Sequence, residues 1–460
     1  MSAPARTSDG ASAPARTSDG PALLDRVERE LADSRARTTT LTDIDDRELV
    51  AQHSSLMSPL VWDLAHVGNY EELWLARAAA GLAPYRPDLD DLYDAFAHPR
   101  RDRPSLPILG PREARAYVRD VRDRVLDGMS RTDFAGDDEL VSAGFVHAMV
   151  FQHEHQHAET MLATHQLRSG APELRASGEL PVVHASRETS MVPDVLVDGG
   201  PFVRGTSTDP WALDNERPAH VADVAAFRID VFPVSNAQYT RFIAAGGYDD
   251  ERLWSPEGWA HRQAEHLEAP AYWVGDGAGG FVVRRFGIPT ELVPDEPVQH
   301  VTFHEAEAYA RWVGRRLPTE TEWEKACSWD PVEGRARPFP WGTADLDPSR
   351  ANLAYGTGIG ALRPASIGAY PAGASAYGVQ QLIGDVWEWT STTFTGYPGF
   401  GAWPYPEYSE VFFGGDYRVL RGGSWATHPT AIRSTFRNWD YPIRRQIFAG
   451  FRTAVSVKGN

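Results

Sequence analysis

The chain has 460 residues, a formal net charge of −18, and 42% hydrophobic and 23% charged residues. This length predicts two or three domains, and the composition is typical of a soluble globular protein. The acidic balance argues against nucleic acid or an anionic membrane as the main partner.

The single cysteine, Cys327, excludes an intrachain disulfide and fits a reducing compartment. No apolar run is long enough to cross a bilayer, and no segment near the start resembles a secretory signal. We therefore expect a cytoplasmic protein with no membrane partner and, by default, a monomer.

Residues 1–20 contain a tandem copy, SAPARTSDG followed by ASAPARTSDG. This composition of Ala, Pro, Ser and Gly cannot bury a core, so we expect a disordered tail.

Residues 21–185 are predicted to form a helical domain. Apolar residues recur at steps of three and four in four segments, residues 21–44, 58–81, 110–129 and 137–170. Four long helices of this kind indicate an up-and-down bundle.

Residues 186–460 have a different pattern and are predicted to form a second domain. Short apolar runs alternate with Gly, Pro, Asn and Asp clusters, and only residues 236–247 and 303–316 have a clear helical pattern. We expect an irregular, loop-rich domain, which gives the whole chain an α+β fold class.

The stretch HEHQH contains a candidate metal site. His153 and His157 lie one helical turn apart, so both imidazoles can reach one ion. The motif is also the H-E-x-x-H signature of zinc metalloproteases, in which Glu154 would be the catalytic base. His66, on a second predicted helix, offers a third ligand and favours a three-histidine centre with open positions. Imidazole suits zinc, iron, copper and nickel alike.

Several motifs of the second domain resemble formylglycine-generating-enzyme-like domains, which share a fold with C-type lectins. They are RRLPTETEWEKA (residues 315–326), GDVWEWTS (384–391), LRGGSW (420–425) and GFRTA (450–454). Those enzymes use a cysteine pair, whereas this chain has Cys327 alone. We therefore do not expect their activity here.

The predicted bundle resembles DinB-like domains, and the two domains together resemble the ergothioneine-biosynthesis sulfoxide synthases (EgtB type) over about residues 22–456. In that family a non-haem iron(II), held by three histidines, uses O₂ to join a thiol to carbon 2 of the hercynine imidazole. The product is a sulfoxide. The resemblance implies iron(II) as cofactor, with His66, His153 and His157 as its ligands.

The resemblance also assigns substrate contacts. Hercynine, a trimethylhistidine, would contact Gln156, Asn438 and Trp439. The thiol substrate, γ-glutamylcysteine or cysteine, would place its carboxylates on Arg100 and Arg103 and its amine on Asp440, with help from Arg444. The family's proton-donating tyrosine corresponds to Tyr405, with Tyr408 as its supporting partner.

Two other functions remain as alternatives. A zinc-dependent hydrolase would use HEHQH as its metal motif. A non-catalytic binding module would use the same two domains without oxygen chemistry.

Overall fold

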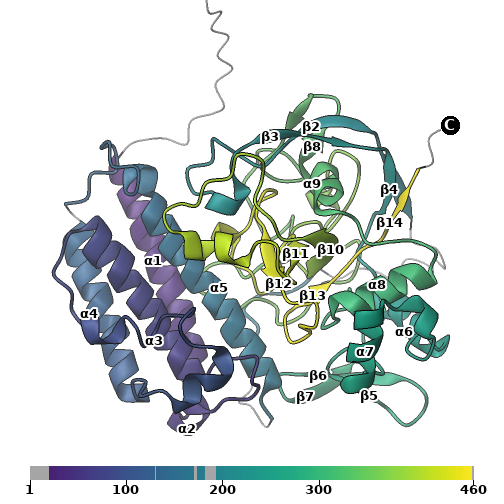
Figure 1. Ribbon diagram of the computed structural model, residues 1–460, viewed down its shortest axis with the longest axis horizontal. Coiled ribbons are helices and arrows are strands. Elements are labelled where there is room, and N and C mark those ends of the chain that lie inside the picture. Colours follow the sequence, from purple (N-terminus) through teal and green to yellow (C-terminus); the bar gives the residue numbers. More distant parts are fainter. Residues whose placement is uncertain (1–19, 130, 170–173, 182–192, 458–460) are drawn as a thin grey trace, which may run out of the picture.

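The computed structural model describes residues 20–129, 131–169, 174–181 and 193–457 (Figure 1). A helical N-terminal region lies beside a larger region of short helices, small sheets and long loops. This architecture confirms the α+β fold class. The predicted tail, residues 1–20, lies outside the described residues except for Gly20, and so does the predicted domain boundary near residue 185.

Four long helices form the bundle, as the apolar periodicity predicts. They are α1 (Gly20–Thr42), α3 (Leu60–Glu71), α4 (Pro111–Met129) and α5 (Phe145–Leu167), with the short α2 (Asp46–Val50) after α1. Helix α1 packs along α5, and α3 packs along both α4 and α5. None of the helices in the described part of the chain is both long and apolar enough to cross a membrane.

The start of α5 differs from the prediction, which placed it near residue 137. Ala143 and Gly144 have positive φ angles of 52° and 74°, so a right-handed helix cannot run through them. Helix α5 therefore begins at Phe145.

Helix α3 is buried over its whole length, including its polar residues Asp63, His66, Asn69 and Glu71. Buried polar groups need partners, so this helix is constrained on every face. It continues directly into a π-helical segment (Glu72–Ala79), a geometry that is frequent at functional sites.

The C-terminal region contains four α-helices in its described part, two more than predicted. Besides α6 (Asn236–Ala244) and α8 (Phe303–Trp312), it forms α7 (Pro256–Ala264) and α9 (Glu320–Ser328). The signal for the two additional helices is local. Ser255 and Thr319 cap their N-termini, each accepting a hydrogen bond from the backbone N–H three residues later.

The strands form five small sheets in the described residues. Their orders are β1-β4-β14, β12-β11-β10-β13, β2-β3, β5-β6-β7 and β8-β9. The pairing is antiparallel except between β10 and β13. The strands are β1 (Asp194–Val197), β2 (Gly200–Arg204), β3 (His220–Val224), β4 (Phe227–Asp230), β5 (Trp273–Gly275), β6 (Phe281–Arg285), β7 (Ile288–Glu291), β8 (Trp329–Asp330), β9 (Arg335–Ala336), β10 (Trp387–Thr393), β11 (Arg418–Arg421), β12 (Asn438–Asp440), β13 (Ala449–Gly450) and β14 (Ala454–Ser456).

A buried ion network fixes strand β12, which carries three of the predicted substrate contacts. Arg437, the residue before β12, donates to both carboxylate oxygens of Glu320 at 2.6 and 3.0 Å. Arg421 donates to the same carboxylate at 3.0 Å. A bidentate pair of this kind restricts geometry as well as adding energy, so the position of β12 depends on α9.

The two regions share one continuous set of buried apolar side chains. Helix α5 lies on the side of the bundle that faces the C-terminal region (Figure 1). Polar contacts across this interface include Trp211 Nε1 to the Ala143 carbonyl (3.0 Å) and Arg433 to Gln152 (3.2 Å). The cavity described below is therefore enclosed by both regions.

Buried histidines make the fold sensitive to acid. Burial lowers the pKa of His147 and of His165 to about 4 and that of His300 to about 3. An unfolded histidine titrates near pH ~6.5. Between about pH 6.5 and 4 these histidines therefore bind protons in the unfolded chain but stay neutral in the folded chain. The stability that these residues contribute is present above pH ~6.5 and is lost as the pH falls towards about 4.

We expect the thermal midpoint to fall between about pH 7 and pH 5.5, a range above most carboxylate titrations. His165→Gln should make the thermal midpoint depend less steeply on pH, because unfolding of the variant takes up about one proton fewer. The measurement is calorimetry over pH, and a midpoint that is constant over this range would contradict the assignment of these histidines as neutral.

Candidate metal centre and adjoining cavity

Three histidines converge where α3 meets α5. His66 comes from α3, and His153 and His157 come from consecutive turns of α5, with one ligand atom of each within 4.8 Å of the others. The ring centroids are 4.6 to 5.1 Å apart, and the ring planes are inclined by 50° to 59°. Imidazole binds a metal through an in-plane lone pair, so inclined rings can direct three lone pairs to one point.

Neighbouring groups set the orientation of each ring. His66 Nδ1 lies 2.8 Å from the Tyr93 carbonyl, to which it must donate, and His157 Nδ1 lies 3.0 Å from Asp63 Oδ1. In both rings Nε2 then carries the free lone pair. The carboxylate partner is typical of metal-bound histidine.

The third ring, His153, is held by stacking instead of by a hydrogen bond. It lies on the ring of Tyr70, with centroids 3.8 Å apart and an interplanar angle of 17°. Burial lowers the pKa of His66 and of His153 well below the usual value, so both are neutral at pH 7, as metal ligation requires. The residues therefore fit a divalent transition metal such as iron, zinc, copper or nickel.

A second group of potential ligands, Glu30, His155 and His428, does not meet the same criterion. The rings of His155 and His428 are stacked in parallel, 3.7 Å apart and inclined by 8°. Their in-plane lone pairs therefore run side by side and do not meet. Of these two groups in the described part of the chain, only the first therefore has the geometry of a metal centre.

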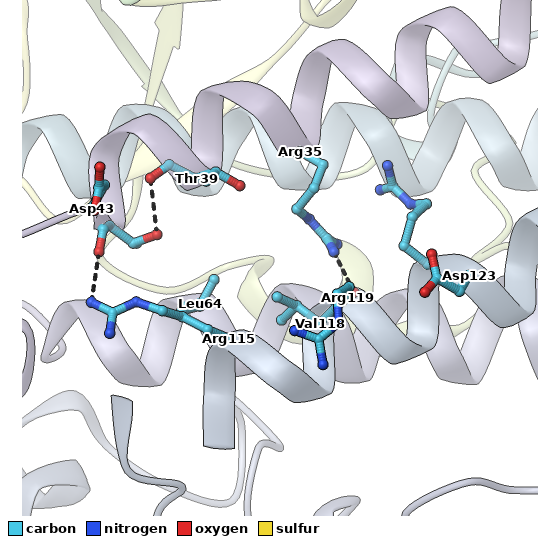
Figure 2. Close-up of a pocket in the computed structure, with 10 residues that line it drawn as sticks. Arg35, Thr39, Asp43, Leu64, Arg115, Val118, Arg119 and Asp123 are labelled. Atoms are coloured by element: carbon cyan, nitrogen blue, oxygen red, sulfur yellow. Dashed lines mark hydrogen bonds between the residues drawn. The ribbon is translucent and has the colours of Figure 1, made fainter. Parts of the chain in front are cut away.

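Glu154, the base of the metalloprotease alternative, points away from the three histidines. Its carboxylate pairs with Arg35 at 2.7 Å and with Arg122 at 3.2 Å, on the side that faces α1 and α4. A small hollow of about 330 Å³ opens there, and Arg35 also donates to the Val118 carbonyl across it (Figure 2). This position removes Glu154 from the metal centre, so the zinc hydrolase would lack its base.

A cavity of about 690 Å³ lies between the bundle and the C-terminal region. Its volume is in the range of small-molecule sites. The structure brings together on its wall nine of the residues predicted from sequence, namely Arg100, Arg103, Gln156, His157, Tyr408, Asn438, Trp439, Asp440 and Arg444. His66, His153 and Tyr405 are not among the residues that line it.

The two predicted tyrosines lie in the loop between β10 and β11 and contact neighbours of the three histidines. The Tyr405 hydroxyl lies 2.8 Å from the Tyr70 hydroxyl, and Gln156 donates to the Tyr408 hydroxyl at 3.4 Å. Burial raises the pKa of both Tyr405 and Tyr408 above the usual value. Both phenols are therefore protonated at neutral pH and can serve as proton donors.

The arginines in the segment before α4 have different surroundings. Arg103 is buried over the ring of Trp62 and donates to Ser58 and to the carbonyls of His98 and Ala95. Its guanidinium is thus already engaged by the protein itself. Arg100 is only partly buried.

Arg100 and Arg444 form the cationic end of the cavity. Both guanidiniums donate to the Leu56 carbonyl, at 3.2 and 3.0 Å, although they belong to different regions of the fold. Asp440 lies 3.5 Å from Arg444. Two guanidiniums that meet at one carbonyl, of which only Arg444 pairs with an acid among the described residues, favour an anionic ligand.

Glu159 lines the same cavity and was not among the predicted residues. It accepts hydrogen bonds from Trp387 (2.8 Å), Ser424 (2.6 Å) and Thr427 (2.8 Å), all neutral donors. Burial raises the pKa of its carboxyl. The signal in the sequence is its spacing, since Glu159 follows Gln156 by three residues and shares its helix face.

Fold and centre together define a class of protein in which a DinB bundle and a formylglycine-generating-enzyme-like domain enclose a cavity beside three convergent histidines. Residues 28–161 match the DinB superfamily, and residues 179–457 match the sulfatase-modifying factor enzyme 1-like domain. The chain belongs to the hercynine oxygenase family, which confirms the resemblance inferred from the motifs.

The relatives that support this assignment cover nearly the whole chain. It is 54% identical over 436 residues to the hercynine oxygenase of Mycolicibacterium smegmatis, covering 93% of this chain and 98% of that protein. The hercynine oxygenase of Mycobacterium tuberculosis is 53% identical over 433 residues, with the same coverage. The formylglycine-generating enzyme of Bos taurus is 31% identical over 315 residues, covering 62% of this chain and 79% of that enzyme.

We expect the purified chain to bind one divalent transition-metal ion, and His66→Ala to lose it. Asp63→Asn should weaken binding by about 10- to 100-fold, because an amide orients His157 less well than a carboxylate. Metal content and competition with a chelator measure both effects. His428→Gln is the control and should retain full affinity; a loss of metal in that variant would place an ion at the stacked pair instead.

Proposed function

We propose that this protein is a non-haem iron(II)- and O₂-dependent sulfoxide synthase. It joins the sulfur of γ-glutamylcysteine, or of cysteine, to carbon 2 of the hercynine imidazole. The observation that carries the proposal is the charge pattern of one cavity, which has an acid, Glu159, and a pair of arginines, Arg100 and Arg444, beside a three-histidine centre. These charges are complementary to a trimethylammonium group and to a substrate with carboxylates.

Iron(II) held by His66, His153 and His157 would supply the redox chemistry that O₂ activation requires. The overall reaction balances as thiol plus hercynine plus O₂, giving the sulfoxide and one water. One oxygen atom ends on sulfur and the other in water, and the thiol S–H and the imidazole C–H provide the two hydrogens.

The hercynine end of the cavity combines aromatic faces with negative charge. Trp439 is stacked on Phe394, with centroids 4.1 Å apart, and Tyr408 approaches it edge-on. A quaternary ammonium cannot accept or donate hydrogen bonds, so aromatic faces and the Glu159 carboxylate are its appropriate partners. Gln156 and Asn438 offer the amide groups that orient the rest of the molecule.

The thiol substrate binds at the opposite, cationic end. Arg100 and Arg444 take its carboxylates, and Asp440 takes its amine. Arg103 contributes as a support, because its contacts with Ser58 and Trp62 hold the segment that carries Arg100. The Tyr405 hydroxyl supplies the proton at its Oη that steers the reaction from thiol oxidation to C–S bond formation, with Tyr408 as its neighbour.

The decisive experiment is mass spectrometry of aerobic reactions that contain the iron-loaded protein, hercynine, and either γ-glutamylcysteine or cysteine. We expect a product with the mass of both substrates plus one oxygen atom and minus two hydrogens. Oxygen consumption should require both substrates, and zinc-loaded protein should be inactive. Metal-dependent turnover without oxygen would support the hydrolase, and metal without any turnover would support the binding module.

We expect Glu159→Gln to raise the KM for hercynine by about ten- to a hundredfold, because a buried carboxylate attracts the trimethylammonium cation more strongly than a neutral amide does. The KM for γ-glutamylcysteine should stay unchanged, which makes the second substrate an internal control. Steady-state kinetics measure both constants, and an equal rise in both would show a general disturbance of the cavity instead of a trimethylammonium contact.

A further inference from the structure

Tyr70 contacts both the candidate metal centre and Tyr405. Its ring covers one face of His153, with centroids 3.8 Å apart, and its hydroxyl lies 2.8 Å from the Tyr405 hydroxyl. Tyr70 comes from α3 of the bundle, whereas Tyr405 comes from the C-terminal region. The two phenols thus form a hydrogen-bonded pair that bridges the two regions.

The burial of the two phenols indicates the direction of the hydrogen bond. Tyr70 is 8% exposed, and Tyr405 is the partner that the described residues offer to its hydroxyl. A buried hydroxyl needs an acceptor for its proton, so Tyr70 donates to Tyr405. Tyr405 accepts this hydrogen bond with an oxygen lone pair, so its own proton can be directed to another partner.

The ring of Tyr405 is fixed by the same helix. Trp74 stacks on it, with centroids 5.0 Å apart and an interplanar angle of 28°, and Tyr408 meets it edge-on at 6.0 Å. His66, Tyr70 and Trp74 follow one another at intervals of four residues, where α3 passes into the π-helical segment. One face of this helix therefore supplies a candidate metal ligand, His66, the hydrogen-bond partner of Tyr405, Tyr70, and the ring that stacks on Tyr405, Trp74.

We propose that Tyr70 is a positioning residue for Tyr405: it donates a hydrogen bond to the Tyr405 oxygen and so leaves the Tyr405 proton free for delivery to the reacting substrates. This inference rests on the proposed function, in which Tyr405 is the proton donor. Without the Tyr70 hydroxyl, no donor would fix the orientation of the Tyr405 O–H group, which would then rotate between orientations.

The test compares Tyr70→Phe, Tyr405→Phe and the double variant. Phenylalanine keeps the stack on His153 and removes only the hydroxyl. We expect Tyr405→Phe to divert product from the sulfoxide to the sulfinic acid of the thiol. Tyr70→Phe should lower the sulfoxide rate by about tenfold, the effect of one hydrogen bond, with a partial shift of product in the same direction and unchanged KM values.

The double variant distinguishes positioning from a separate contribution. If Tyr70 acts through Tyr405, the double variant should give the same product ratio and rate as Tyr405→Phe alone. Effects that multiply, or a native product ratio in Tyr70→Phe, would overturn the proposal. A lower metal content in Tyr70→Phe would also overturn it, because the residue would then act through His153.

A measurement on the metal-free protein separates this proposal from the proposed function. In thermal unfolding, the losses from Tyr70→Phe and Tyr405→Phe should be less than additive, since both remove the same hydrogen bond. Tyr117→Phe is the matched control, because its buried hydroxyl bonds to Glu72 at 2.8 Å; its loss should add to that of Tyr405→Phe. Additive losses from the proposed pair would contradict the hydrogen bond, whereas absence of sulfoxide from the native protein would contradict only the function.

Discussion

Every face of helix α5 makes specific polar or aromatic contacts around the HEHQH stretch, and this constraint determines much of the structure. Within HEHQH, consecutive side chains turn by about 100° and so meet different surroundings. His153 and His157 face α3 and the metal centre, Glu154 faces the arginines of α1 and α4, His155 stacks on the C-terminal region, and Gln156 faces Tyr408. A shift of this helix by one residue would break all four sets of contacts at once. The two regions therefore fix the position of the metal ligands jointly.

The buried charges divide into two kinds. Most are compensated by the protein, as in the pairs of Glu154 with Arg35 and of Glu320 with Arg437, where a lost partner would leave a charge without solvent. The charges on the cavity wall are less completely paired. Glu159 accepts hydrogen bonds from neutral donors and has the buried Arg37 as a nearby charge without a hydrogen bond to it, and Arg444 pairs with Asp440 close to a second cation, Arg100. A buried charge without an opposite charge beside it lowers the stability of the unliganded protein. Such a charge is reasonable where a bound ligand of opposite charge pairs with it. This contrast supports the proposal that the cavity binds groups of both charges.

The sequence predicts those features that repeat along the chain or that single motifs carry. Four-residue spacing gave the bundle helices and the pairing of His153 with His157, and a histidine among apolar residues pointed to His66. The start of α5 depended on the backbone at Ala143, which no side-chain pattern reveals. Contacts that join distant segments were equally inaccessible. Arg103 donates to Ser58, which precedes it by 45 residues, and Glu159 accepts hydrogen bonds from Trp387 and Thr427 of the C-terminal region.

The C-terminal domain has the fold of formylglycine-generating enzymes without their cysteine pair. Its one cysteine, Cys327, is buried in α9 and hydrogen-bonded to Ser434, and burial raises the pKa of its thiol to about 12. A thiol in that state is a poor nucleophile and a poor metal ligand, so this domain has no thiol chemistry of its own to contribute. What it contributes is shape and charge: a rigid strand, β12, that presents Asn438, Trp439 and Asp440 to the cavity. The three histidines of the candidate metal centre all come from the bundle. The proposed binding surface and the candidate metal centre thus come from two separate folds that meet at one interface, and the hydroxyl pair of Tyr70 and Tyr405 joins them there.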